Sequence, residues 1–172
     1  MRIHPQKTPA TVVFGLLGLL VTHTASAADI RGTISSTLTI TEDSQLVGHV
    51  TCTVTGAACI SFGASGIALK LNGFSITGQA HPVVGCSQTI FNEVGILLNG
   101  VRGAVIQGPG IVQRFRGAGI YLLGQSSRVR VALATVSTNC ASGILVGHSP
   151  DNEFEGNIAV RNGSPTLPCG GI

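Results

Sequence analysis

Three features of the sequence predict an all-β chain folded as a solenoid of stacked coils. A Gly-Ile pair followed by apolar residues recurs at Gly95, Gly119 and Gly143, each 24 residues after the last. The repeat is rich in Gly, Val, Ile and Thr, which favours short strands joined by tight turns over helices. Charged residues make up only 10% and aromatic residues 4%, less than in a conventional globular domain. Each repeat therefore reads as one coil of a parallel β-helix, which buries its apolar side chains against neighbouring coils.

The repeat extends on both sides of this central region. An earlier copy is expected at Gly66, and a short one begins at Gly171. Val112, Val136 and Val160 follow the same 24-residue step and predict a third strand in each coil. Four to five coils are expected, closed at a common corner by three residues: Phe115, Asn139 and Asn162.

The first 27 residues have the pattern of a secretory signal peptide. Arg2 and Lys7 supply positive charge, residues 12–21 (VVFGLLGLLV) form a short apolar core, and Ala25-Ser26-Ala27 is a small-x-small cleavage site. Ten apolar residues are too few to span a bilayer comfortably, although an uncleaved anchor is the alternative. The sequence thus predicts a secreted or periplasmic protein with no membrane span after signal removal.

The mature chain, residues 28–172, reads as one β-helix domain. We expect residues 28–62 to form an N-terminal cap and residues 63–172 to form the coils, with a long loop at 77–94 that interrupts the repeat. Without the signal peptide, Arg and Lys nearly balance Asp and Glu, so no basic face for nucleic acid is predicted.

Export places the five cysteines in an oxidising compartment, where pairing is favoured. Cys52 and Cys59 enclose a short turn-like loop and are predicted to pair. Cys140 and Cys169 precede equivalent positions of successive coils, so a second bridge between them is possible. Cys86 would then be the odd thiol.

Three segments resemble coils of the pectin-lyase-like superfamily of right-handed parallel β-helix proteins: residues 69–78 (LKLNGFSITG), 105–111 (VIQGPGI) and 151–158 (DNEFEGNI). The resemblance covers roughly residues 33–172 and implies the fold. The superfamily includes pectate lyases and polygalacturonases, but also many non-catalytic repeat proteins, so it does not imply one activity. The Asn-Thr-Asp, Asp-Asp and Gly-His-Gly elements of the hydrolases are absent here, and we predict no catalytic residues.

Asp151, Glu153 and Glu155 alternate along one predicted strand and so share one face. Because Ca²⁺ takes carboxylate oxygens as ligands, they form a weak candidate Ca²⁺ site; no other cofactor is expected. An ion-pair ladder fits better. If Phe154 and Val129 both point inward, two cross-coil pairs result: Arg128 with Glu153, and Arg130 with Glu155.

Arg114 and Arg116 flank the inward-pointing Phe115, with Tyr121 a few residues further on. Arginines beside an aromatic ring on a shallow face can bind acidic sugars through ion pairs and stacking. These three residues are the candidate ligand-binding set.

The chain stops just after a fifth coil opens at Cys169-Gly170-Gly171-Ile172, which suggests truncation or self-association through an open edge. We expect a non-catalytic exported scaffold that contacts polysaccharide or another envelope protein. The alternatives are the N-terminal part of a polysaccharide lyase or glycoside hydrolase whose catalytic coils are missing, and a structural spacer of the adhesin kind.

Overall fold

The computed structural model describes residues 27–80, 86 and 90–164. These residues form strands, turns and bends only, so no helix among them could cross a membrane. The predicted signal peptide, apart from Ala27, lies outside the described residues, as do Cys169 and the other residues of the expected fifth coil.

The strands belong to two parallel sheets. Sheet A contains β1 (Ala28–Ile34), β3 (Ser44–Cys52), β5 (Ala68–Lys70), β6 (Ser75–Thr77), β8 (Val105–Gln113), β10 (Arg130–Ser137), β12 (Glu153–Glu155) and β13 (Ile158–Val160). Sheet B contains β2 (Leu38–Ile40), β4 (Ile60–Phe62), β7 (Ile96–Asn99), β9 (Ile120–Leu123) and β11 (Ile144–Val146).

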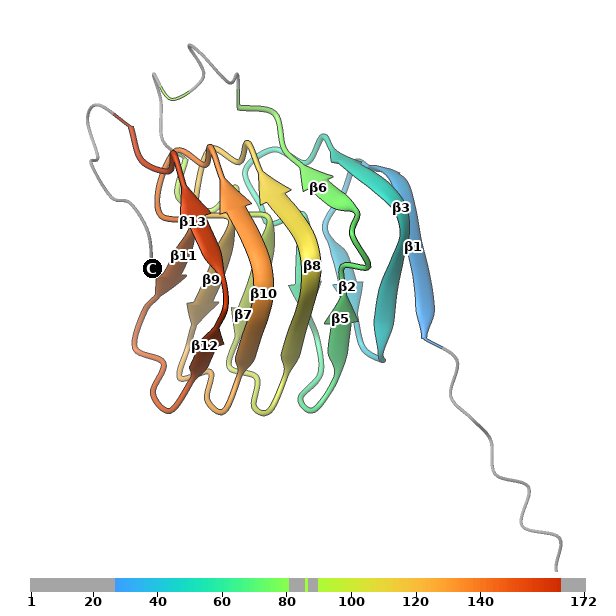
Figure 1. The fold of residues 1–172 in the computed structure, drawn as a ribbon, viewed down its shortest axis with the longest axis vertical. Helices are drawn as coiled ribbons and strands as arrows, with labels where there is room; N and C mark the ends of the chain where they lie inside the picture. The colour runs from blue at the N-terminus through green and yellow to red at the C-terminus, as the bar shows by residue number, and fades with distance from the viewer. Residues whose placement is uncertain (1–26, 81–85, 87–89, 165–172) are drawn as a thin grey trace, which may run out of the picture.

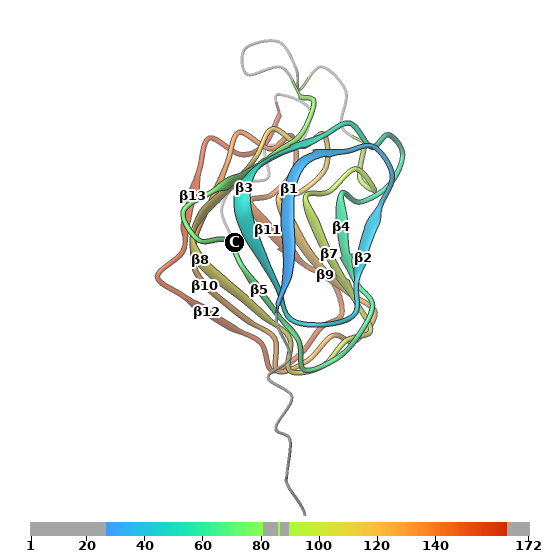
Figure 2. The same cartoon turned by 90° about the vertical axis from the view of Figure 1, so that its right-hand side faces the viewer.

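The chain alternates between the sheets, so each coil contributes one segment to sheet A and one to sheet B (Figure 1). Figure 2 looks onto the first coil, with β1 and β2 in front and the later coils stacked behind them. The predicted all-β solenoid of a few stacked parallel coils is confirmed. Residues 28–62 make its first two coils, β1 with β2 and β3 with β4.

Three long strands of sheet A, β3, β8 and β10, each pair with two short strands. Residues 105–107 of β8 pair with β5, and residues 111–113 pair with β6. β10 pairs with β12 and β13 in the same way. The register shifts by one residue between the two halves of the β8–β10 ladder. Such an irregularity bends the strand, so its two halves face outward in different directions.

The repeat correctly predicts the register of sheet B, where Ile96 pairs with Ile120 and Ile120 with Ile144. All three side chains are buried. Burying one such side chain contributes roughly 1.5–3 kcal/mol, which makes these stacked isoleucines a main source of stability.

Two register predictions are wrong. The residue equivalent to Ile96 in the preceding coil is Ile60, whereas the Gly66 copy leads into sheet A, where Ile67 accepts a hydrogen bond from Val105. On sheet A, Val136 pairs with Val112 as expected, but its partner in the last coil is Ala159 rather than Val160.

Asparagine side chains tie the last coil to the one before it. Asn152, Asn157 and Asn162 are five residues apart, and each side-chain oxygen accepts a backbone N–H of the preceding coil at 2.9–3.1 Å. Each side-chain amide also donates to a backbone carbonyl of that coil. Each hydrogen bond contributes on the order of 1 kcal/mol, and together they satisfy backbone groups within and beside β10.

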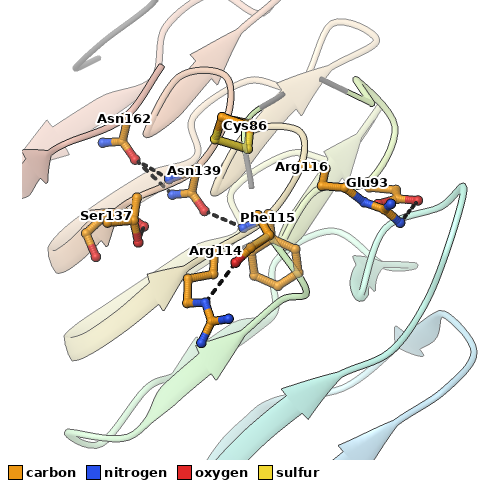
Figure 3. Close-up of a disulfide and its surroundings, with 11 residues drawn as sticks. Cys86, Glu93, Arg114, Phe115, Arg116, Ser137, Asn139 and Asn162 are labelled. Carbon is orange, nitrogen blue, oxygen red and sulfur yellow. Dashed lines mark hydrogen bonds and ion pairs between the residues drawn. A yellow bond between two sulfur atoms is a disulfide. The ribbon is translucent and has the colours of Figure 1, made fainter. Parts of the chain in front are cut away.

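The predicted common corner is confirmed at Phe115, Asn139 and Asn162 (Figure 3). Asn139 is fully buried; its side-chain oxygen accepts the Phe115 N–H at 3.0 Å and its amide donates to Val112. Asn162 repeats this arrangement one coil later and lies next to Asn139, to which its side-chain oxygen is hydrogen-bonded.

Candidate ligand-binding groove

Two disulfides fasten the irregular segments to the coils. The predicted Cys52–Cys59 bridge is present. The proposed Cys140–Cys169 bridge and the free Cys86 are wrong, because Cys86 pairs with Cys140 across a Cα–Cα distance of 5.0 Å (Figure 3). Cys86 lies in the segment that interrupts the repeat, so its position in the coil could not be deduced from periodicity.

A largely buried ion pair lies at the same corner. Arg116 donates two hydrogen bonds to Glu93, Nε to Oε2 at 2.5 Å and Nη2 to Oε1 at 2.8 Å (Figure 3). The Glu93 side chain is 7% exposed and that of Arg116 27%. Glu93 Oε1 also accepts the Gly56 N–H at 2.7 Å, so one carboxylate joins three segments of the chain.

The loop at residues 53–58 is held on several sides. The Cys52–Cys59 bridge closes its ends, and Asn92 Nδ2 donates to the Gly56 carbonyl at 2.5 Å. Thr37 Oγ1 donates to the Ala58 carbonyl at 2.7 Å. Gly56 has φ +70°, a backbone conformation that glycine adopts without strain. These contacts make the loop a fixed wall beside sheet B.

A groove of about 320 Å³ lies between this wall and the outer face of sheet B, a volume within the usual range for ligand sites. Its floor comes from side chains on β4, β7 and β9, and its wall from residues that precede β2, β4 and β7. The lining residues are Thr37, Gly56, Ala57, Ala58, Ser61, Asn92, Val94, Leu97, Tyr121 and Leu123.

The floor follows the strand register. Ser61 pairs with Leu97, and Leu97 with Tyr121, so these side chains stand in one row across three coils. Leu97 and Tyr121 pack on the buried side chains of Val94 and Ala118. The hydroxyls of Ser61 and Tyr121 make no hydrogen bond to any described residue. The floor therefore combines apolar surface with two unused hydroxyls.

The three predicted ligand-binding residues do not form one site. Arg114 and Arg116 do flank the buried Phe115, but Arg114 Nε donates to the Ala80 carbonyl at 2.8 Å and Arg116 is engaged by Glu93 (Figure 3). Only Tyr121 lines the groove. The groove's other residues belong to non-repeating loops or to ordinary strand positions, and no motif in the sequence marks them.

One of the two predicted ion pairs on sheet A is confirmed, since Arg130 pairs with Glu155. The other is wrong: Phe154 pairs with Val131 rather than Val129, and Glu153 lies 3.7 Å from Arg130 instead of contacting Arg128. The hydrogen bond from Arg130 to Glu155 raises the pKa of Arg130 above its ordinary value.

The candidate Ca²⁺ site does not fit this geometry. Glu153 and Glu155 are directed to Arg130, while the Asp151 backbone carbonyl accepts a hydrogen bond from Arg128. Within residues 27–80, 86 and 90–164, no three His, Cys, Asp or Glu side chains are grouped to hold a metal.

The fold and its covalent links define a parallel β-solenoid braced by two disulfides, which indicates an oxidising, extracytoplasmic environment. Comparison with protein-family models, with curated proteins and with solved structures finds no match for this chain. Its function is therefore argued from the groove.

Proposed function

We propose that this chain is an extracytoplasmic, non-catalytic β-solenoid module that binds polysaccharide in the groove on the outer face of sheet B. The observation that carries the proposal is the row of Ser61, Leu97 and Tyr121 beside a fixed loop wall. An aromatic ring and aliphatic side chains can pack on the C–H faces of sugar rings, while the hydroxyls bond to sugar hydroxyls.

Two further considerations support a binding module. The resemblance to the pectin-lyase-like superfamily, with its right-handed coils, favours a polysaccharide over a protein ligand. The wall is held by a disulfide, by Asn92 and by Glu93 before any ligand arrives. Such preorganisation reduces the entropy lost on binding.

The experiment is electrophoresis of the purified protein through native gels that contain a soluble polysaccharide, one polysaccharide per gel. The Ser61→Gln variant should fill the groove, and Ser137→Gln is its matched control, since Ser137 lies on sheet A and lines no part of the groove. We expect retardation of the wild type and of Ser137→Gln, and at least a tenfold weaker effect for Ser61→Gln.

Retardation that survives in Ser61→Gln would place the contact elsewhere on the molecule. Absence of retardation with every polysaccharide would overturn the proposal and favour a structural spacer. Release of reducing ends, or of unsaturated uronides, from any bound polysaccharide would overturn its non-catalytic part and favour the lyase or hydrolase alternative.

A further inference from the structure

We infer that the groove selects an uncharged polysaccharide, bound across the coils, and discriminates against acidic ones. This inference rests on the proposed function and adds the ligand class. It departs from the expectation from sequence, in which Arg114 and Arg116 bind acidic sugars, because the structure gives both arginines other partners.

The electrostatics of the groove are the first argument. None of its lining residues is charged. Glu93, which lies between two lining residues in the sequence, is bound to Arg116 through two hydrogen bonds. A uronate would therefore lose water against Val94, Leu97 and Leu123 without gaining a cation, and such desolvation is unfavourable.

The unused hydrogen-bonding groups are the second argument. The Ser61 and Tyr121 hydroxyls each can donate and accept, and Asn92 offers its side-chain oxygen because its amide donates to Gly56. Sugar hydroxyls likewise both donate and accept, so they can satisfy all three groups. An ionised carboxylate only accepts hydrogen bonds, so it cannot bond to the Asn92 side-chain oxygen, which is also an acceptor.

The direction of the groove indicates an extended ligand. Thr37 precedes β2, Ser61 is in β4, Leu97 in β7 and Tyr121 in β9, so the lining residues come from four successive coils. Four parallel strands span about 14 Å at the usual spacing of about 4.8 Å. A chain of several sugar units can contact all of them, whereas a single sugar cannot.

Isothermal titration calorimetry with matched oligosaccharides tests the inference. The neutral probes are gluco-, manno- and xylo-oligosaccharides, and the acidic probes are oligogalacturonates and alginate oligomers of equal length. We expect at least tenfold tighter binding of the best neutral probe. Its affinity should not change with salt, because no ion pair contributes.

The Glu93→Gln variant removes the negative charge that neutralises Arg116. The carbonyl oxygen of the substituted glutamine can still accept the Gly56 N–H, but Arg116 loses its counter-charge beside the groove. Affinity for oligogalacturonate should rise about fivefold at low salt, the size of one partly exposed ion pair, with the neutral probe unchanged. Glu153→Gln is the matched control, because it removes an equal charge from sheet A, and it should alter neither affinity.

Tighter, salt-sensitive binding of acidic probes to the wild type would overturn the ligand class but leave the proposed function standing. Failure of every probe to bind would overturn both. Circular dichroism shows whether Glu93→Gln folds; if it does not, the comparison of wild-type affinities still decides the question. An equal rise in acidic affinity in both variants would assign the effect to overall charge and contradict the role of Arg116.

Discussion

Two parts of this solenoid join its coils by different means. At the corner where β8, β10 and β13 end, the Cys86–Cys140 bridge, the Glu93–Arg116 pair and the Asn139–Asn162 ladder lie close together and are largely buried (Figure 3). On the outer face of sheet A, Arg130 bridges to Glu153 and Glu155, whose side chains are exposed, and is itself half-exposed.

The two regions use similar chemistry with unequal consequences. Glu93 and Arg130 each take part in an arginine–carboxylate pair between segments far apart in the sequence. Water can replace the partners of Arg130, but it cannot reach Glu93 without opening the corner. Mutational effects should therefore be large at the corner and small on sheet A.

The largest effect is expected for the double variant Cys86→Ser with Cys140→Ser. This bridge closes a separation of 54 residues, and its loss should lower the free energy of unfolding by about 4 kcal/mol through the entropy of the unfolded chain. Urea denaturation of the oxidised proteins measures it. The Cys52–Cys59 bridge closes a separation of only 7 residues, so the double variant Cys52→Ser with Cys59→Ser should lower the free energy of unfolding by only about 2 kcal/mol. Equal losses for the two double variants would contradict the chain-entropy explanation.

Arg116→Ala should have the next largest effect. It leaves the Glu93 carboxylate buried without its counter-charge, which costs about 3 kcal/mol of stability. Glu93→Gln keeps an acceptor for Gly56 and leaves the more exposed Arg116 able to hydrate, so it should lose less. Urea denaturation again measures the loss of stability. A greater loss for Glu93→Gln than for Arg116→Ala would contradict the claim that the uncompensated Glu93 carboxylate is the costlier of the two charges to leave buried.

Asn139→Ala should destabilise by about 2 kcal/mol. It removes the acceptor for the Phe115 N–H and the donor to Val112 at a position that water does not reach. Hydrogen exchange of the Phe115 amide is the specific readout, since that N–H should become unprotected. Asn157→Ala, at a half-exposed turn of the last coil, is the comparison and should lose less.

Glu155→Gln on sheet A should have the smallest effect. Arg130 keeps Glu153 as a partner, and salt screens an exposed pair. Because the pKa of Arg130 is raised on folding, this contribution is complete below the unfolded-state pKa of arginine, which lies far above neutral pH, and disappears only as the pH rises beyond it. Thermal melts should therefore show no pH-dependent difference between wild type and variant from pH 7 to about 9.

The sequence predicts sheet B well because the interval between Ile96, Ile120 and Ile144 is constant. The interval on sheet A is not constant. Val105 pairs with Arg130 but Arg130 with Glu153, so the second interval is two residues shorter. Applying the interval of the preceding coil to the last coil therefore placed Phe154 against the wrong residue, and nothing in the local sequence indicates that the interval becomes shorter.

The site was less predictable than the fold. Tyr121 could be selected as an aromatic residue close in sequence to two arginines, but Glu93 and Cys86 lie in the segment that interrupts the repeat. Their partners, Arg116 and Cys140, depend on how that segment crosses the corner. Gly56, Ala57 and Asn92 line the groove through backbone position and small size, which leave no pattern in a single sequence.

The most direct test of the groove uses its own chromophore. Tyr121 is the only tyrosine and the chain has no tryptophan, so intrinsic fluorescence reports this position alone. Titration with a neutral oligosaccharide should change the Tyr121 emission and reach saturation, and Ser61→Gln should abolish the change. Binding detected by calorimetry with unaltered Tyr121 emission would contradict the account, because the ligand would then lie away from the groove.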